Sequence, residues 1–140
     1  MKVTLEDYLM GRDALYPDEC TPEVMANASV VVERVNSLLA AMRADGVPIE
    51  ENPRTKSLLN SGWRPAVVNG QTKGAAPKSK HMTGEACDLY DPEGALDDWC
   101  MAHPDSLASL GLWMEHPSAT KGWLHLQIVP PRSGNRVFYP

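Results

Sequence analysis

Apolar residues in the first third of the chain recur every three or four positions, which is the spacing of one face of an α-helix. Thr21 precedes this pattern as a helix cap, and Pro22 occupies the first helical position. Glu23 follows, an acid that the helix dipole favours, and Asp45 with the next glycine ends the pattern. The sequence therefore predicts one long amphipathic helix that serves as core scaffold. Its apolar stripe consists of Val24, Ala28, Val31, Val35, Leu38 and Met42.

The second half of the chain carries shorter apolar runs, most of which predict strands. Residues 85–90 predict a strand, and residues 96–101 fit a short helix that ends near Pro104. Residues 110–115 and 123–129 predict two strands. The polar turn HPSATKG joins these two strands, which indicates a β-hairpin.

The remaining segments show little regular pattern. Residues 47–80 contain Pro and Gly throughout and predict loops with short strands. We expect the tail, residues 130–140, to be irregular and packed on the surface. A helix followed by strands, without regular βαβ alternation, indicates an α+β fold. Residues 1–140 are expected to form a single domain, because a chain of this length can bury a core of its own.

The composition argues against several classes of function. The net charge of −5 disfavours a nucleic-acid binder, which needs a basic surface. No run of about 18 apolar residues occurs, so we expect no membrane insertion. The first residues do not form a secretory signal, so a cytoplasmic location on synthesis is expected. Three cysteines without framework spacing predict reduced thiols. Basic residues do lie close together in one part of the sequence, where they form either a solvated loop or a surface that attracts an anionic substrate. They are Arg64, Lys73, Lys78 and Lys80.

One stretch, SKHMTGEACD, joins a histidine to an aspartate seven positions later. Gly84 between them disfavours a helix, so we predict a turn there, with Asp88 on a strand that returns past His81. Zinc binds imidazole nitrogen and carboxylate oxygen, and a catalytic zinc site needs three protein ligands. A third ligand is therefore expected elsewhere in the chain.

His125, in the run GWLHLQ, is the candidate third ligand. It lies among apolar residues of a predicted strand, and a buried histidine needs a polar partner. A metal ion would be one such partner, whereas a main-chain carbonyl would make His125 an ordinary core residue. His103 and His116 fit helix-end and turn positions without chemistry. Two histidines and a carboxylate also suit divalent metals other than zinc.

Three blocks of the sequence resemble a known family of zinc peptidases. The middle block, Ser-x-His-x-x-Gly-x-Ala-x-Asp, is complete from Ser79 to Asp88, with SGWRP and its Arg64 upstream and GWLH with His125 downstream. In this order, over residues 61–127, the blocks resemble the zinc D-alanyl-D-alanine peptidases and the phage L-alanyl-D-glutamate endolysins, which share their fold with the Hedgehog signalling domain. The N-terminal helix looks like that of the small phage and prophage versions.

The resemblance implies one zinc ion per chain, bound by His81, Asp88 and His125. It implies that Arg64 contacts the scissile carbonyl or its oxyanion, and that Ser79 lies beside the substrate as a hydrogen-bond donor. The implied fold is a small antiparallel sheet with flanking helices and the zinc in a groove on the sheet. Zinc would make hydroxide available near neutral pH, and Arg64 would add positive charge where the oxyanion forms.

Hydrolysis also needs a general base, and here the chain departs from the family. Many relatives carry a Glu three residues before the last histidine or a His two before it, where this chain has Gly122 and Trp123. A hairpin turn centred near Ala119 would place Glu115 opposite Trp123 and Trp113 opposite the last histidine. Glu115 would then share the face of that histidine and lie diagonal to it, so we predict Glu115 as the base.

Two other residues are alternative bases. A slip of one residue in the hairpin register would turn His116 towards the site instead. Glu85 lies inside the ligand loop, where we expect it to point outward. Without a catalytic role, Glu115 would be a solvated acid of the hairpin.

The sequence thus predicts a zinc peptidase that hydrolyses an amide bond in the peptide part of bacterial peptidoglycan. The bond is D-Ala–D-Ala, L-Ala–D-Glu or a cross-link. We expect a monomer of phage or prophage origin that binds the stem peptide and reaches the wall after release or as part of a virion. The alternative is an inactive, zinc-stabilised binding module for wall peptides or a protein partner, which Gly122 and Trp123 would explain. A metal-free α+β domain with a chance motif is the third hypothesis.

Overall fold

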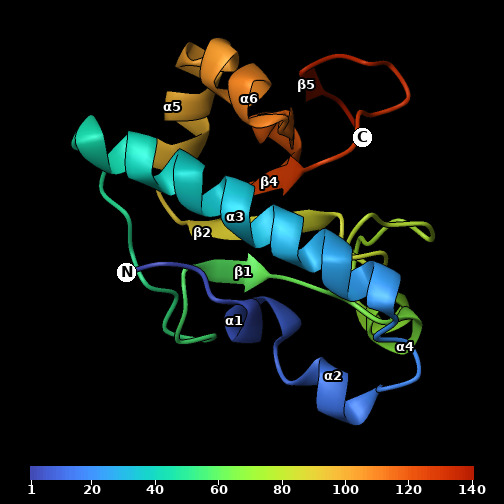
Figure 1. Ribbon diagram of the computed structural model, residues 1–140. Helices are drawn as coiled ribbons and strands as arrows, with labels where there is room; N and C mark the ends of the chain where they lie inside the picture. The colour runs from blue at the N-terminus through green and yellow to red at the C-terminus, as the bar shows by residue number, and fades with distance from the viewer.

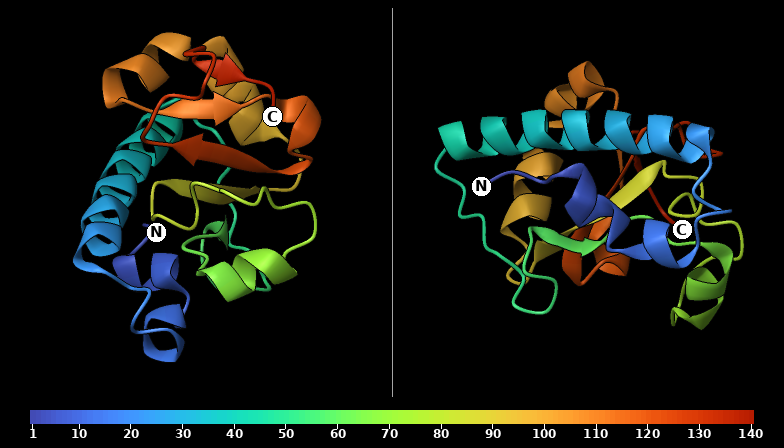
Figure 2. Two further views of the ribbon diagram at one scale, coloured as in Figure 1. Left: turned by 90° about the vertical axis from the view of Figure 1, so that its right-hand side faces the viewer. Right: turned by 60° about the horizontal axis from the view of Figure 1, so that its bottom comes forward.

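The longest element of the computed structural model, which describes residues 1–140, is helix α3 (Pro22–Ala44). Figure 1 and Figure 2 show it lying across one side of the β-sheet. The hydroxyl of Thr21 accepts a hydrogen bond from the main-chain N–H of Val24 at 3.2 Å, and Pro22 begins the helix. The cap at the other end is Asp45, and all residues of the predicted apolar stripe are buried. The predicted helix is confirmed at both ends and on its buried face.

Five strands form one sheet in the order β1-β2-β4-β3-β5. The central pair, β2 and β4, runs antiparallel with Asp88 directly opposite His125. The strands predicted near residues 85–90 and 123–129 are confirmed by these two elements. The five strands are β1 (Leu59–Ser61), β2 (Ala86–Asp91), β3 (Trp113–Glu115), β4 (Gly122–Gln127) and β5 (Val137–Phe138).

The sheet is mixed, because β5 runs parallel to β3 at the sheet edge. This corrects the expectation of a purely antiparallel sheet. It also corrects the expectation of a wholly irregular tail, since Val137 pairs with Met114 and Phe138 with Glu115. A strand of two residues has no periodicity that a sequence could display. It forms because β3 offers an unpaired edge whose main-chain groups need partners.

Five short helices and a 3₁₀ turn surround the sheet, and the sequence predicted only α5. The others are too short to show a helical period, so they were missed. No helix has both the length and the apolar character that crossing a bilayer requires. The elements are α1 (Leu5–Leu9), α2 (Arg12–Leu15), α4 (Ala66–Gln71), α5 (Ala95–Ala102), α6 (Pro104–Leu110) and η1 (Pro117–Ala119).

The predicted hairpin of β3 and β4 forms, but with a shorter first strand and a different register. Helix α6 continues to Leu110 and ends at Gly111 with a φ of 65°, so β3 begins only at Trp113. Trp113 pairs with Gln127, two residues along from the expected partner His125. A shift of two residues keeps every side chain on its expected face, because strand side chains alternate with a period of two.

The central strands separate an apolar face from a polar one. Cys87, Leu89, Leu124 and Leu126 are fully buried in one core with the stripe of α3. Cys87 therefore faces away from Asp88, as expected for neighbours on a regular strand. The alternate positions of the same strands carry the polar side chains of the candidate site.

Candidate metal centre

His81, Asp88 and His125 come together on the polar face of the sheet. Each offers one ligand atom, and these atoms all lie within 4.8 Å of one another. The three residues are buried, with exposed fractions of 1%, 6% and 8%. Asp88 and His125 are cross-strand partners in the middle of β2 and β4, whereas His81 comes from the loop before β2. The cluster predicted from sequence is thus a feature of the fold.

The loop that carries His81 depends on the predicted turn at Gly84. Its φ is +76°, a conformation in which glycine has no steric cost. A Cβ at this position would lie 2.7 Å from the main-chain oxygen of Val24 in α3, too close for any other residue. The turn therefore lets the loop pass tightly under the helix and return as β2, which brings His81 back to Asp88.

The hydrogen bonds of the two histidines leave one bare nitrogen on each ring. Nδ1–H of His81 donates to the carbonyl of Gly62 at 2.8 Å, because a carbonyl can only accept. Nε2–H of His125 donates to Oε1 of Gln127 at 2.9 Å. The remaining nitrogens lie 3.1 Å (His81 Nε2) and 2.9 Å (His125 Nδ1) from Oδ1 of Asp88.

Two nitrogen lone pairs and a carboxylate oxygen thus converge with no proton of the neutral side chains between them. Such a buried arrangement needs a positive charge at its centre, either a metal ion or a proton on one ring. The donor set also matches the preference of zinc for imidazole and carboxylate. The residues present therefore fit a metal ion.

Charge and burial set the protonation of these three groups. Burial acts to raise the pKa of Asp88, but the attraction of His81 and His125, whose facing nitrogens lie at hydrogen-bond distance, outweighs it and holds the pKa well below its usual range. Burial lowers the pKa of His81. For His125 the hydrogen bond and the charge of Asp88 outweigh burial, so the pKa is raised. Of the two rings, His125 is therefore the one that keeps a second proton to the higher pH in the metal-free protein.

Glu115 lies on the same face, in β3. Trp113 pairs with Gln127 and Met114 with Leu126, and extending this register by one residue brings Glu115 level with His125 rather than diagonal to it as the sequence predicted. Glu115 lines a cavity of about 570 Å³ that also contains Asp88 and His125. Burial raises the pKa of Glu115, the positive charge of His125 opposes this, and Asp88 adds to it. A carboxyl with a raised pKa beside the cluster is suited to exchange protons.

The two alternative bases lie outside this cavity. His116 caps η1 through a hydrogen bond from the main-chain N–H of Ser118 and stacks on Tyr139, with ring centroids 4.5 Å apart. Glu85 accepts a hydrogen bond from the hydroxyl of Thr83 at an exposed position. Among the three candidates, the fold brings only Glu115 into the cavity.

Arg64 and Ser79 meet in the wall of the same cavity. Nη2–H of Arg64 donates to the hydroxyl of Ser79 at 3.1 Å, and Arg64 as a whole is only 8% exposed. The same hydroxyl accepts a bond from the main-chain N–H of His81 at 3.2 Å, so its own hydrogen is free to donate. Burial lowers the pKa of Arg64, and the charge of Asp88 opposes this. Arg64 therefore supplies a positive charge to the cavity wall, and Ser79 helps to hold it in place.

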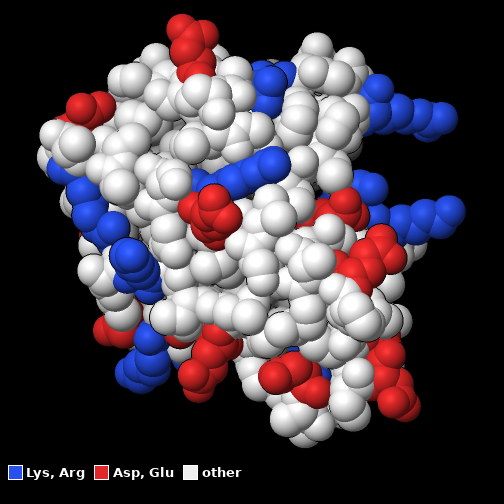
Figure 3. Space-filling view, in the orientation of Figure 1, with Lys and Arg blue, Asp and Glu red and all other residues white.

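The rim of the cavity is basic, while the face seen in Figure 3 carries both signs interspersed. Aromatic side chains line it as well, two of them from the tail that the sequence left irregular. The sequence also missed Gln127, although its place two residues after His125 puts it on the same strand face. Trp123 lines the cavity, whereas Trp63 is in the core. The rim residues are Lys73, Lys78, Lys80, Arg132, Trp123, Phe138 and Tyr139.

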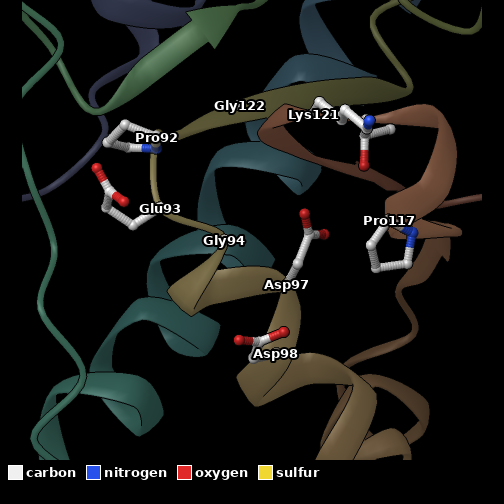
Figure 4. A pocket seen from close by; sticks show the side chains of 9 residues that line it. Pro92, Glu93, Gly94, Asp97, Asp98, Pro117, Lys121 and Gly122 are labelled. Atoms are coloured by element: carbon white, nitrogen blue, oxygen red, sulfur yellow. The ribbon is translucent and has the colours of Figure 1, made fainter.

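A second, smaller cavity of about 240 Å³ lies at the ends of β2 and β4. Figure 4 shows Asp97 pointing into it. Burial, together with Asp91 and Asp98 nearby, raises the pKa of Asp97 to about 7. Its lining contains carboxylates and one lysine but no histidine or cysteine. The imidazole ligands of the candidate centre therefore all belong to the larger cavity.

Comparisons of the chain with protein-family models, with curated proteins and with solved structures found no match.

Proposed function

We propose that this protein is a zinc peptidase that hydrolyses an amide bond in the peptide part of bacterial peptidoglycan. The observation that carries the proposal is the buried cluster of His81, Asp88 and His125, whose bare nitrogens face one carboxylate oxygen. Bound zinc would lower the pKa of water and polarise the amide carbonyl. The resemblance of the three sequence blocks to the zinc peptidases and endolysins points the same way.

The chain's own residues supply the remaining chemistry. Glu115 takes the proton from the attacking water and passes it to the leaving amine, a transfer that its place beside the cluster allows. Arg64 holds positive charge where the carbonyl oxygen becomes an oxyanion, and Ser79 both orients that guanidinium and donates its own hydrogen. Because these groups are held by the fold before substrate binds, little reorganisation accompanies the reaction.

The basic rim supports a peptide substrate that carries carboxylates. Stem peptides of peptidoglycan have free carboxylates near their amide bonds, and positive side chains around the mouth would attract them. The aromatic side chains of the lining add an apolar surface. D-Ala–D-Ala, L-Ala–D-Glu and cross-link bonds all fit this description. A phage or prophage protein would meet this substrate after release from the cell or as part of a virion.

A zinc-stabilised binding module is the second candidate. Gly122 and Trp123 stand where many members of the family carry their base, so a loss of catalysis with retention of the metal would explain the sequence. The binding partner would then be a wall peptide or another protein. The presence of Glu115 in the cavity favours the enzyme.

The deciding experiment is a digest of purified peptidoglycan with and without a chelator, analysed by mass spectrometry. We expect fragments that disappear when the metal is removed. Free D-alanine would identify a carboxypeptidase, and a new D-Glu amino terminus would identify an endopeptidase. Bound zinc without any cleavage would favour the binding module. If protein purified without chelator holds no zinc, the third hypothesis, a metal-free domain with a chance motif, would be favoured.

A further inference from the structure

Gln127 is the only side chain that contacts the outer nitrogen of His125 by a hydrogen bond. It lies two residues further along β4 on the same face and is 5% exposed. Its Oε1 is 2.9 Å from Nε2 of His125, and its Nε2 is 2.9 Å from the carbonyl oxygen of Val129. The three groups form a short chain that leads away from the candidate metal.

The carbonyl of Val129, at the end of this series of hydrogen bonds, fixes the direction of each bond in the series. The carbonyl of Val129 can only accept, so the amide of Gln127 must turn its NH₂ group towards Val129 and its oxygen towards His125. That oxygen can only accept as well, so His125 must carry its hydrogen on Nε2. Nδ1 is then left bare and faces Asp88 Oδ1 at 2.9 Å.

We propose that Gln127 is a positioning residue that selects the metal-binding tautomer of His125 and so raises the metal affinity of the site. The proposal rests on the proposed metal centre, and Gln127 itself touches neither metal nor substrate. Partners of this kind orient the ring and increase the basicity of the ligand nitrogen, and their loss typically costs about 10–100-fold in metal affinity.

Both histidines have their tautomer fixed by a hydrogen bond, but the acceptor of that bond differs. Nδ1–H of His81 donates to the main-chain carbonyl of Gly62, which no substitution can remove. The orientation of His125 depends on a side chain instead. The contribution of an outer partner can therefore be tested at His125 without altering a ligand.

The experiment measures zinc affinity by competition with a chromophoric chelator, in the absence of substrate. The variants are Gln127→Leu, which removes the acceptor, and Gln127→Glu, which keeps an acceptor oxygen at the same reach. Gln71→Leu, at the exposed end of α4, controls for the chemical change. We expect Gln127→Leu to bind zinc about 10–100-fold more weakly. The other two variants should remain within a few-fold of the unmodified protein.

Equal zinc affinity in Gln127→Leu and the unmodified protein would overturn the proposal. So would an equal loss in Gln127→Glu, because an acceptor oxygen beyond His125 would then not be sufficient for the metal affinity. A second measurement needs no substitution: long-range ¹H–¹⁵N NMR of the zinc-loaded protein should show Nε2 of His125 protonated. A proton on Nδ1 would contradict the proposal even if Gln127→Leu failed to fold.

These measurements separate the inference from the proposed function. Zinc binding that depends on Gln127, without any cleavage of peptidoglycan, would leave the inference standing and overturn the peptidase. Cleavage with zinc affinity that is indifferent to Gln127 would do the reverse. A chain that binds no zinc would overturn both.

Discussion

The two faces of the central strands are both buried but are stabilised in opposite ways. On the α3 side, Leu124 and Leu126 are fully buried among other apolar side chains. On the other side, Asp88 and His125 are almost as inaccessible, yet their contacts are hydrogen bonds and opposite charges. The apolar face contributes stability directly, whereas burial of a charge costs free energy unless a partner offsets it. The polar face therefore indicates a purpose beyond stability, and the two faces should respond differently to substitution.

Removing the carboxylate from the polar face should have the largest effect. In Asp88→Asn the two bare histidine nitrogens lose the negative oxygen between them, and the site loses one of its three ligands. We expect bound zinc to fall to an undetectable level by elemental analysis, and hydrolysis to stop with it. The exposed Asp98→Asn should keep both. Normal zinc content in Asp88→Asn would mean that the metal binds elsewhere.

Glu115→Gln should separate catalysis from metal binding on the same face. The amide cannot accept the proton of water, so we expect turnover to fall by about 10²–10⁴-fold while zinc content is unchanged. The control is Glu85→Gln, because Glu85 is an acid of the ligand loop outside the cavity. Steady-state kinetics on a soluble stem peptide would measure the effect. Full activity in Glu115→Gln would remove this residue from the mechanism.

A cavity on the apolar face should reduce stability without changing the chemistry. Leu126 is fully buried, and truncation to Ala should lower the free energy of unfolding by about 2–5 kcal/mol. Urea unfolding of the chelator-treated protein would measure this loss. Zinc content should stay the same at temperatures where the variant is folded. A folded Leu126→Ala protein without zinc would show that the two faces are coupled.

The pH dependence of zinc affinity should show the smallest effect and report on the protons of the polar face. Asp88 raises the pKa of His125, so in the metal-free protein this ring keeps its proton to a higher pH than an ordinary histidine. Zinc must displace that proton, whereas His81, whose pKa is lowered by burial, is already neutral. Affinity should therefore rise as the pH rises, by about tenfold per pH unit below the raised pKa of His125.

This dependence can be measured by chelator competition at several pH values. It should level off above the pKa of His125, where no proton remains to be displaced. The His116→Gln variant, altered at a half-buried histidine outside the cavity, should give the same curve. An affinity that does not change with pH would mean that the site holds no displaceable proton.

Much of this molecule could be predicted from local pattern. Helix α3 was predicted because a cap, a proline and a recurring apolar residue all act within a few positions of one another. The strands that carry Asp88 and His125 were predicted from short apolar runs, which are local patterns as well. The three ligands were predicted from their residue types and from the resemblance of the sequence blocks. The identity of the family stays a prediction.

What the sequence alone could not determine depends on how distant segments pair. The register of β3 on β4 brings Glu115 level with His125, and it results from the length of α6 and of the connecting turn together. The pairing of β5 with β3 is a contact between segments that carry no pattern of their own. The bare nitrogen of His125 likewise depends on which side chain lies beyond the ring. By itself the sequence determined which residues are available for chemistry, because residue type and periodicity are local properties. Only the tertiary structure decided which atoms of those residues face one another, because that depends on register and packing between segments far apart in the chain.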